Sequence, residues 1–195
     1  MLGLMQSQPL AISSLIDFAE RHHGDTEIVS RRVEGDLHRY TWRDVARRAR
    51  QAANALDGMN LVFSDRVATL AWNGYRHLEL YFGVSGSGRV LHTINPRLHP
   101  DQIAWIANHA EDQVLCFDLT FLPLVQAVHA RCPTIRHYVA MCDTDKLPAD
   151  SGIPNLVSYE SWIGGQPTTY QWPTFDENSA SSMCYTSGTT GNPKA

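Results

Sequence analysis

Apolar residues along the chain follow two different spacings in turn. Short and almost wholly apolar runs predict strands that are buried on both faces, at residues 67–72, 90–94, 114–117 and 138–141. Between these runs the apolar residues recur every three or four positions, which predicts helices over 75–83, from Pro100 through Ala110, and over 120–131. Regular alternation of strand and helix predicts a parallel sheet with right-handed crossovers, and hence an α/β fold.

The N-terminal part of the chain predicts a helix and a hairpin. Ser13 or Ser14 is a possible cap for a helix that closes near residue 23, and residues 1–12 before it form an N-terminal arm without pattern. Residues 27–40 alternate loosely around a Gly-Asp turn dipeptide, which is typical of a hairpin.

The clearest helical pattern covers residues 42–57. Thr41 and Asp44 in front of it have the spacing of a capping box, and Gly58 ends the run. The apolar positions lie on one face of this helix. Its other face is rich in arginine and is expected to be solvated.

Composition changes after Cys142. Residues 143–178 contain four prolines and three glycines, and only a short helix near residues 159–163 is expected among them. This loop-rich excursion is interpreted as a surface loop between sheet elements. Apolar character returns at residues 182–185, directly before a segment of different composition.

Composition and charge narrow the class of protein. Of the 195 residues 43% are hydrophobic and 18% are charged, which is typical of a globular chain. The net charge is -4 and the only lysines are Lys146 and Lys194, so no basic tract exists for nucleic acid or an anionic membrane. No apolar run approaches the ~20 residues of a membrane span, and no secretion signal begins the chain. These features predict a soluble cytoplasmic protein without nucleic-acid or integral-membrane partners.

The cysteines and histidines do not suggest a metal site. Four cysteines lie far apart in sequence with no CxxC pair, and are expected to be reduced and mostly buried. The nine histidines are scattered as well. A metal site built from protein side chains is therefore not expected.

The last ten residues have the composition of an anion-binding loop. Residues 186–195 hold four hydroxyl side chains, two glycines and one lysine directly after a predicted strand. Glycines let backbone N–H groups approach a phosphate, hydroxyls donate further bonds or reach a bound magnesium ion, and lysine supplies a point charge. The segment is not a Walker A loop, because Asn192 and Pro193 separate Gly191 from Lys194. On composition alone a flexible tail is an equal alternative.

The order of these residues favours an anion-binding loop over a flexible tail. Tyr185-Thr186-Ser187-Gly188-Thr189-Thr190-Gly191-Asn192-Pro193-Lys194 resembles the phosphate-loop signature of the adenylate-forming superfamily, which includes acyl-CoA synthetases. Upstream blocks at residues 40–42, 65–73, 76–82, 90–98 and 102–112 look like its fatty-acyl branch. The chain departs from that branch at residues 85–89, where Ser-Gly-Ser-Gly-Arg replaces the usual Pro-Gly-Met-Gly-Ala, and at Ala195, where the signature has glycine.

The resemblance implies a fatty-acid:CoA ligase with ATP, Mg²⁺ and coenzyme A as its reaction partners and a fatty acid as its substrate. The chain would be the N-terminal part of the large domain, with residues 13–195 an incomplete α/β domain, residues 185–195 its phosphate-binding loop, and the C-terminal domain absent. The resemblance also implies that the ATP phosphates are bound by Thr186, Ser187, Gly188, Thr189, Thr190, Gly191 and Lys194. Thr186 would lie nearest magnesium, and no catalytic residue is expected within the fragment, which would be inactive alone. Members of the superfamily are often homodimers.

A second hypothesis belongs to a different class. The chain could be a truncated, non-catalytic module that binds nucleotide or dimerises, because much of the nucleotide pocket of the family is expected outside it. Thioester formation by the isolated chain would exclude that hypothesis.

Several other side chains are interpreted as structural. Packing is favoured over substrate contact for Trp72, Asn73 and His77, which follow a predicted strand. His92 and His109 are expected to be structural histidines, with no acidic partner evident in the sequence. Trp105 is expected in the core or at an interface, and Cys184 is expected to be a small buried residue.

Overall fold

A computed structural model describes residues 3–5, 7–186 and 193–195. Its centre is a six-stranded sheet in which every neighbouring pair of strands is parallel, in the order β7-β6-β5-β3-β4-β8. The strands are β3 (Arg66–Leu70), β4 (Val90–Thr93), β5 (Val114–Phe117), β6 (His137–Ala140), β7 (Leu156–Ser158) and β8 (Ser182–Met183). The predicted α/β class and parallel sheet are confirmed.

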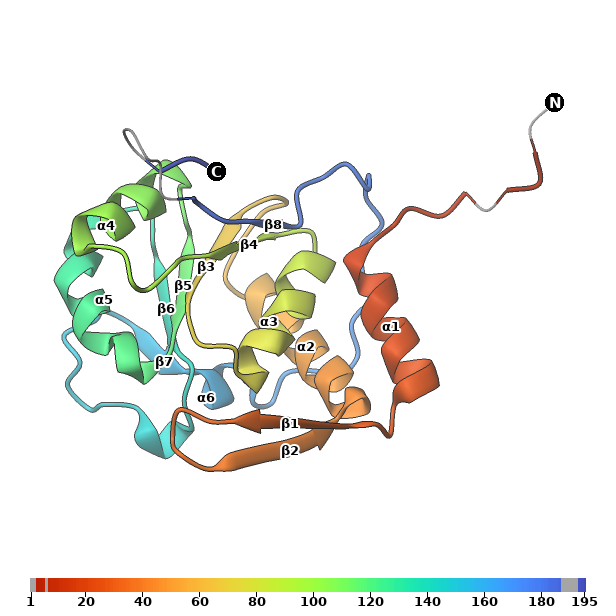
Figure 1. The fold of residues 1–195 in the computed structure, drawn as a ribbon, viewed down its shortest axis with the longest axis horizontal. Helices are drawn as coiled ribbons and strands as arrows, with labels where there is room; N and C mark the ends of the chain where they lie inside the picture. Colours follow the sequence, from red (N-terminus) through yellow and green to blue (C-terminus); the bar gives the residue numbers. More distant parts are fainter. Residues whose placement is uncertain (1–2, 6, 187–192) are drawn as a thin grey trace.

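Helices cover both faces of this sheet (Figure 1). On one side lie α4 (Pro100–His109) and α5 (Leu122–Val128), and on the other lie α1 (Ile12–His23), α2 (Trp42–Asp57), α3 (Tyr75–Gly86) and α6 (Tyr159–Ile163). Short 3-10 helices at Leu119–Phe121, His129–Arg131 and Thr144–Lys146 complete the described helices. The helices that the spacing predicts are all present, and α3 extends three residues beyond its expected end.

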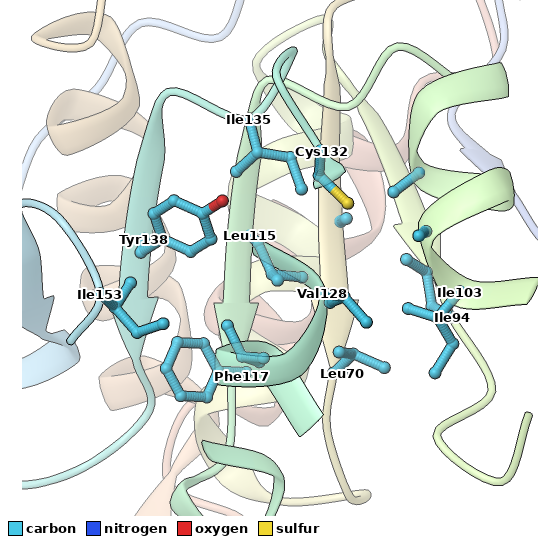
Figure 2. Packing of buried hydrophobic residues seen from close by; sticks show 14 of the residues in the cluster. Leu70, Ile94, Ile103, Leu115, Phe117, Val128, Cys132, Ile135, Tyr138 and Ile153 are labelled. Carbon is cyan, nitrogen blue, oxygen red and sulfur yellow. The ribbon is translucent and has the colours of Figure 1, made fainter. Parts of the chain in front are cut away.

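Strand β3 shows why the central strands are apolar at almost every position. Val67 packs into the cluster that faces α2 and α3, whereas Ala68 and Leu70 pack into the cluster that faces α4 and α5. Figure 2 shows this second cluster, where Leu115, Phe117 and Tyr138 from β5 and β6 meet Ile103 and Val128. A strand that is covered on both faces has no solvent side, so polar alternation is lost.

The start of α1 differs from the expected cap. The residue before the helix is Ala11, and no side chain caps its N-terminus. Ser14 instead donates a hydrogen bond from Oγ to the Ala11 carbonyl, 2.7 Å away, from within the first turn. The predicted caps Ser13 and Ser14 are therefore wrong, because apolar Ile12 already belongs to the helix.

The hairpin lies beside the sheet, not within it. Its strands β1 (Glu27–Arg31) and β2 (Leu37–Thr41) pair antiparallel and form a separate sheet (Figure 1). Directly after β2, Thr41 and Asp44 form the predicted capping box at the start of α2. The hairpin and the box are confirmed.

The excursion at residues 143–178 is more than a surface loop. Residues Leu156–Ser158 form β7, which pairs in parallel with β6 at the edge of the main sheet. Ile153, Tyr159 and Ile163 are buried, and Tyr159 is fully so. The short helix expected near residues 159–163 is confirmed as α6, whereas the interpretation of the excursion as a surface loop is wrong. A strand of three residues between a proline and a helix is too short to show a periodicity.

Residues 85–89 pack closely despite their departure from the usual pattern. Gly88 has φ +80°, and a Cβ atom there would lie 2.9 Å from the Phe63 ring. Ser85 and Arg89 are buried, and Arg89 pairs with Asp57 at 2.7 Å. The glycine therefore serves both the turn and the contact with Phe63.

None of the helices in the described part of the chain combines the length and the apolar character that crossing a membrane requires.

Candidate phosphate-binding site

Strand β8 leads the chain into the site. It pairs in parallel with β4, with Met183 opposite His92. The Ser85 hydroxyl donates a hydrogen bond to the carbonyl of Ser181, 2.7 Å away, immediately before the strand. Residues 184–186 therefore leave the carboxyl end of a strand whose position is fixed by β4 and α3.

The two ends of the predicted phosphate loop are held together. Thr186 and Lys194 form an antiparallel bridge in which each backbone N–H donates to the other's carbonyl, at 2.9 and 3.2 Å. Pro193 is buried, while Thr186 and Lys194 are exposed. The other predicted phosphate ligands, Ser187, Gly188, Thr189, Thr190 and Gly191, lie outside the described residues.

The described ends of this loop fit a magnesium-bound phosphate. The Thr186 hydroxyl donates to the Lys194 carbonyl at 3.2 Å, which leaves the lone pairs of its exposed oxygen available to a metal ion. Among the described residues no three His, Cys, Asp or Glu side chains gather as a metal site.

His92 has an acidic partner, contrary to the expectation from sequence. Its Nδ1 lies 2.9 Å from both carboxylate oxygens of Asp112, and both side chains are fully buried. Burial raises the pKa of Asp112. Because the carboxylate can only accept, Nδ1 carries the proton, and the buried Nε2 has no hydrogen-bond partner among the described residues.

His109 contacts the residue that precedes the phosphate loop. Its Nδ1 and the Tyr185 hydroxyl are hydrogen-bonded at 2.6 Å. Trp105 stacks on His109 with ring centroids 4.7 Å apart. His92 and His109 are both hydrogen-bonded, as predicted, and Trp105 packs against the core cluster on the α4 side as expected. That neither histidine is catalytic stays a prediction.

Cys184 is exposed, so its expected burial is wrong, while Cys116, Cys132 and Cys142 are buried as predicted. The short strand β8 alternates between exposed and half-buried positions because it is an edge strand with one covered face.

Trp72, Asn73 and His77 lie at the end of β3 and the start of α3. His77 is buried between the Thr69 hydroxyl at 3.1 Å and the Trp72 carbonyl at 3.2 Å, and burial lowers its pKa. His77 is packed as predicted, and the partly exposed Trp72 ring packs against Phe121 with centroids 5.1 Å apart, whereas the Asn73 side chain is exposed. Asn73 and His77 line a cavity of about 390 Å³ between β1 and α3.

The crevice where ligands most often bind in such sheets is closed. The chain leaves β3 toward one edge of the sheet and β5 toward the other, so the switch point lies between their carboxyl ends. There Asp118 accepts a hydrogen bond from the Trp72 backbone at 2.7 Å, and burial raises its pKa to about 6. The cavity beside it holds about 20 Å³, the space of one water molecule.

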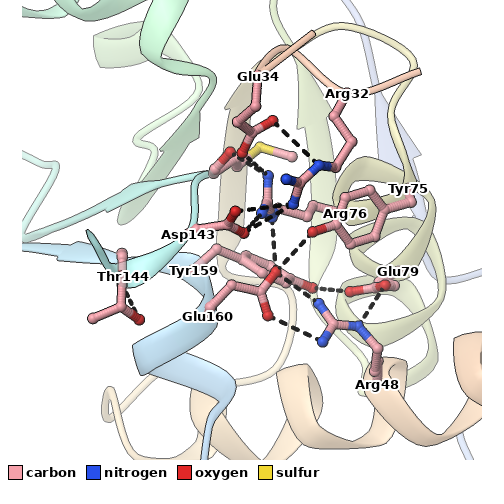
Figure 3. Close-up of polar contacts among 12 residues, drawn as sticks. Arg32, Glu34, Arg48, Tyr75, Arg76, Glu79, Asp143, Thr144, Tyr159 and Glu160 are labelled. Atoms are coloured by element: carbon pink, nitrogen blue, oxygen red, sulfur yellow. Dashed lines mark hydrogen bonds and ion pairs between the residues drawn. The ribbon is translucent and has the colours of Figure 1, made fainter. Parts of the chain in front are cut away.

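The hairpin closes this crevice through ion pairs (Figure 3). Arg32 donates to both carboxylate oxygens of Asp143, at 3.1 and 3.0 Å. Arg76, from α3, donates to Glu34 at 2.8 Å and also to Asp143. The space at the switch point is thus filled largely by the protein's own side chains.

A second part of this network is more deeply buried, and sequence reasoning missed it. Arg48 binds fully buried Glu79 at 2.8 Å and both oxygens of Glu160 at 3.0 Å. Burial outweighs the attraction of Arg48 and raises the pKa of Glu79 to about 7. The expectation that the arginine-rich face of α2 is solvated is wrong for Arg48 and Arg50, whose side chains are only 17% and 16% exposed. Hydropathy spacing counts every arginine as polar and cannot show which ones pair.

The geometry can now be compared with known proteins. Residues 15–195 match the AMP-binding enzyme family. The chain belongs to this family. Relatives include the 3-methylmercaptopropionyl-CoA ligase of Ruegeria lacuscaerulensis, 52% identical, and the medium-chain-fatty-acid–CoA ligase of Ectopseudomonas oleovorans, 50% identical, each over 194 residues. These alignments cover all of this AMP-binding chain but 36% and 35% of the relatives, so it spans about a third of their length.

Solved structures of the family share the fold. An anthranilate CoA ligase in complex with anthranoyl-AMP superposes with a TM-score of 0.83 at 24% identity, over 96% of this chain and 34% of the other. The inhibitor-bound N-terminal domain of FACL13 from Mycobacterium tuberculosis gives 0.78 at 20% identity, over 94% and 43%. The α/β sheet is therefore the N-terminal fold of these AMP-binding enzymes.

Proposed function

We propose that this chain is the N-terminal part of an ATP-dependent acid–thiol ligase that forms acyl-CoA from an aliphatic carboxylic acid. The observation that carries the proposal is the glycine- and hydroxyl-rich segment held by Thr186 and Lys194 at the carboxyl end of β8. The family membership and the printed activities of the relatives support it.

The reaction has two steps. A carboxylate oxygen attacks the α-phosphorus of ATP and pyrophosphate leaves, which gives an acyl-adenylate. The sulfur of coenzyme A then attacks the acyl carbonyl carbon, AMP leaves, and the thiol proton passes to solvent. Negative charge accumulates on the phosphate oxygens and the leaving group, so preorganised donors contribute most to the rate.

This chain contributes donors for that charge. We assign Lys194 to a phosphate oxygen as a point charge, and the Thr186 hydroxyl to a position near Mg²⁺. When bound, Mg²⁺ neutralises charge on the phosphates of ATP. The backbone bridge between Thr186 and Lys194 keeps both groups at the mouth of one loop. Ser187, Gly188, Thr189, Thr190 and Gly191 stay predicted ligands of the ATP phosphates.

The acid is proposed to be a linear aliphatic one of medium length. The relatives at 50–52% identity act by name on a medium-chain fatty acid and on 3-methylmercaptopropionate, and a relative from Thermus thermophilus, 45% identical, is a long-chain-fatty-acid–CoA ligase. All three acids carry an unbranched chain. The cytoplasmic location and the homodimer stay predictions.

The test is pyrophosphate release by the full-length enzyme with ATP, Mg²⁺ and a panel of octanoate, palmitate, 3-(methylthio)propionate and benzoate. Release with a linear acid is expected, and preference for benzoate would contradict the aliphatic assignment. Nucleotide binding without release for any acid would instead favour the non-catalytic module.

Lys194→Gln tests the phosphate assignment in the same assay. We expect kcat/KM for ATP to fall by about 10- to 100-fold, because a charge-assisted bond to phosphate is lost. Lys146→Gln is the matched control, since Lys146 is exposed and pairs only with neighbouring Asp145 among the described contacts. Equal effects of the two substitutions would contradict the assignment.

A further inference from the structure

Tyr185, the residue before Thr186, is bound to a helix that is distant in sequence. Its hydroxyl is hydrogen-bonded to His109 Nδ1 at 2.6 Å, across 76 positions of the chain. The two rings meet edge to face, with centroids 5.7 Å apart and planes at 87°. Trp105 stacks on His109 and meets Tyr185 edge to face at 6.2 Å. Two residues one helical turn apart on α4 thus form a slot for one tyrosine.

A buried histidine–aspartate pair forms the floor of this slot. The His92 ring lies 5.2 Å from the Tyr185 ring between centroids. His92 is held on its other side by Asp112, and both side chains have no exposed surface. The turn that carries Asp112 is itself fixed, because Arg66 donates to the carbonyls of Ala110 and Glu111. The Tyr185 ring therefore packs against a buried side chain that is itself held by hydrogen bonds.

Among the described residues the buried Nε2 of His92 has no hydrogen-bond partner, so the contact of Nδ1 with Asp112 is the described hydrogen bond that orients the ring.

We propose that Tyr185 and His109 are positioning residues for the phosphate loop, and that the His92–Asp112 pair supports them. The proposal rests on the proposed function. Tyr185 shares a peptide bond with Thr186, so its hydrogen bond to His109 fixes one end of the bridge that Thr186 forms with Lys194. Fixing that end before ATP binds removes part of the ordering cost from the binding step.

Tyr185→Phe keeps the ring and removes only the hydrogen bond. In the full-length enzyme we expect KM for ATP to rise about 5- to 10-fold, the loss of one neutral hydrogen bond, with KM for the acid unchanged. Tyr138→Phe is the matched control, because Tyr138 is buried in the same core cluster but lies on β6. It should leave both KM values unchanged.

His109 offers a rescue test for the same bond. His109→Gln retains an acceptor within reach of the tyrosine hydroxyl, whereas His109→Leu does not. We expect the glutamine variant to bind ATP more tightly than the leucine variant. Equal KM values for ATP in these two variants, or an equal rise in KM for the acid, would overturn the proposal.

Amide hydrogen exchange gives a readout that needs no activity. The Thr186 N–H donates to the Lys194 carbonyl at 2.9 Å, and its protection should fall in Tyr185→Phe but not in Tyr138→Phe. Unchanged protection of Thr186 would refute the positioning role. If the wild-type enzyme releases no pyrophosphate, the proposed function fails while the exchange result still decides the role of Tyr185.

Discussion

At the scale of single residues, Glu79 shows how a fully buried carboxylate finds its hydrogen-bond partners within the fold. Glu79 has no exposed surface and accepts hydrogen bonds from Arg48 at 2.8 Å and from the Tyr159 hydroxyl at 2.9 Å. Removing one partner of such a group leaves the other with an uncompensated desolvation cost. The network in Figure 3 therefore joins α2, α3 and α6 as a unit.

Glu79 should make stability depend on pH. Its pKa in the fold is about 7, above the ordinary 4.5, so between these values the folded state binds more protons than the unfolded state. The free energy of unfolding therefore falls as pH rises from about 5 to 8. Glu79→Gln cannot titrate, so the stability of the wild type relative to this variant should decrease by about 2–3 kcal/mol over that range.

Urea unfolding at pH 5, 6, 7 and 8 measures this difference. Glu27→Gln is the control, because Glu27 forms an exposed pair with Arg39 and its removal should change stability by less than about 1 kcal/mol at each pH. A difference between wild type and Glu79→Gln that is constant with pH would contradict the argument.

At the scale of elements, the contact between α2 and α3 depends on small residues. Gly83 of α3 faces Ala49, Ala52 and Ala53 of α2. A Cβ atom at Gly83 would lie 2.9 Å from the Ala49 carbonyl oxygen and 3.1 Å from the Ala52 Cβ atom. The backbones approach so closely that a methyl group has no space.

Gly83→Ala should therefore destabilise the fold although alanine favours helices. The gain in helix propensity is about 1 kcal/mol, and overpacking against a backbone oxygen costs about 1–3 kcal/mol, so a net loss of up to about 2 kcal/mol is expected. Gly58→Ala is the control, since its Cβ atom would lie 3.4 Å from the nearest atom. Thermal unfolding measures the Tm of both variants. A Tm of Gly83→Ala above that of the wild type would contradict the argument that the two helices approach too closely for a methyl group.

The elements also show where sequence patterns reach their limit. The capping box of Thr41 and Asp44 was predictable because both partners lie within one helical turn. The pair of His92 and Asp112 was not, because the crossover through α4 brings together residues 20 positions apart. Strand β7 was missed because three residues do not define a period.

At the scale of the whole molecule, the central strands of the sheet are expected to be its most stable part. Strands β3 and β5 have a neighbour on each side and lie between two layers of helices, whereas β8 has two residues at one edge. Opening an edge strand exposes few apolar side chains, so it costs less free energy than unfolding of the core.

Hydrogen exchange should follow this order. We expect the amides of β3 and β5 to exchange only through global unfolding, and those of β8 to exchange at least about 100-fold faster. The measurement is native-state exchange followed by mass spectrometry or NMR. Equal protection of β8 and β3 would show that the segment around the phosphate loop is as stable as the core.

By itself the sequence determined the α/β class, the order of the main elements and the resemblance of residues 185–194 to a phosphate loop. These features depend on periodicity and on motifs that span at most a few turns of chain. The tertiary structure alone decided that the hairpin fills the switch point, that Arg48 is buried with Glu79, and that Tyr185 binds His109. Each of these depends on the order of strands in the sheet, because only that order brings distant side chains into contact.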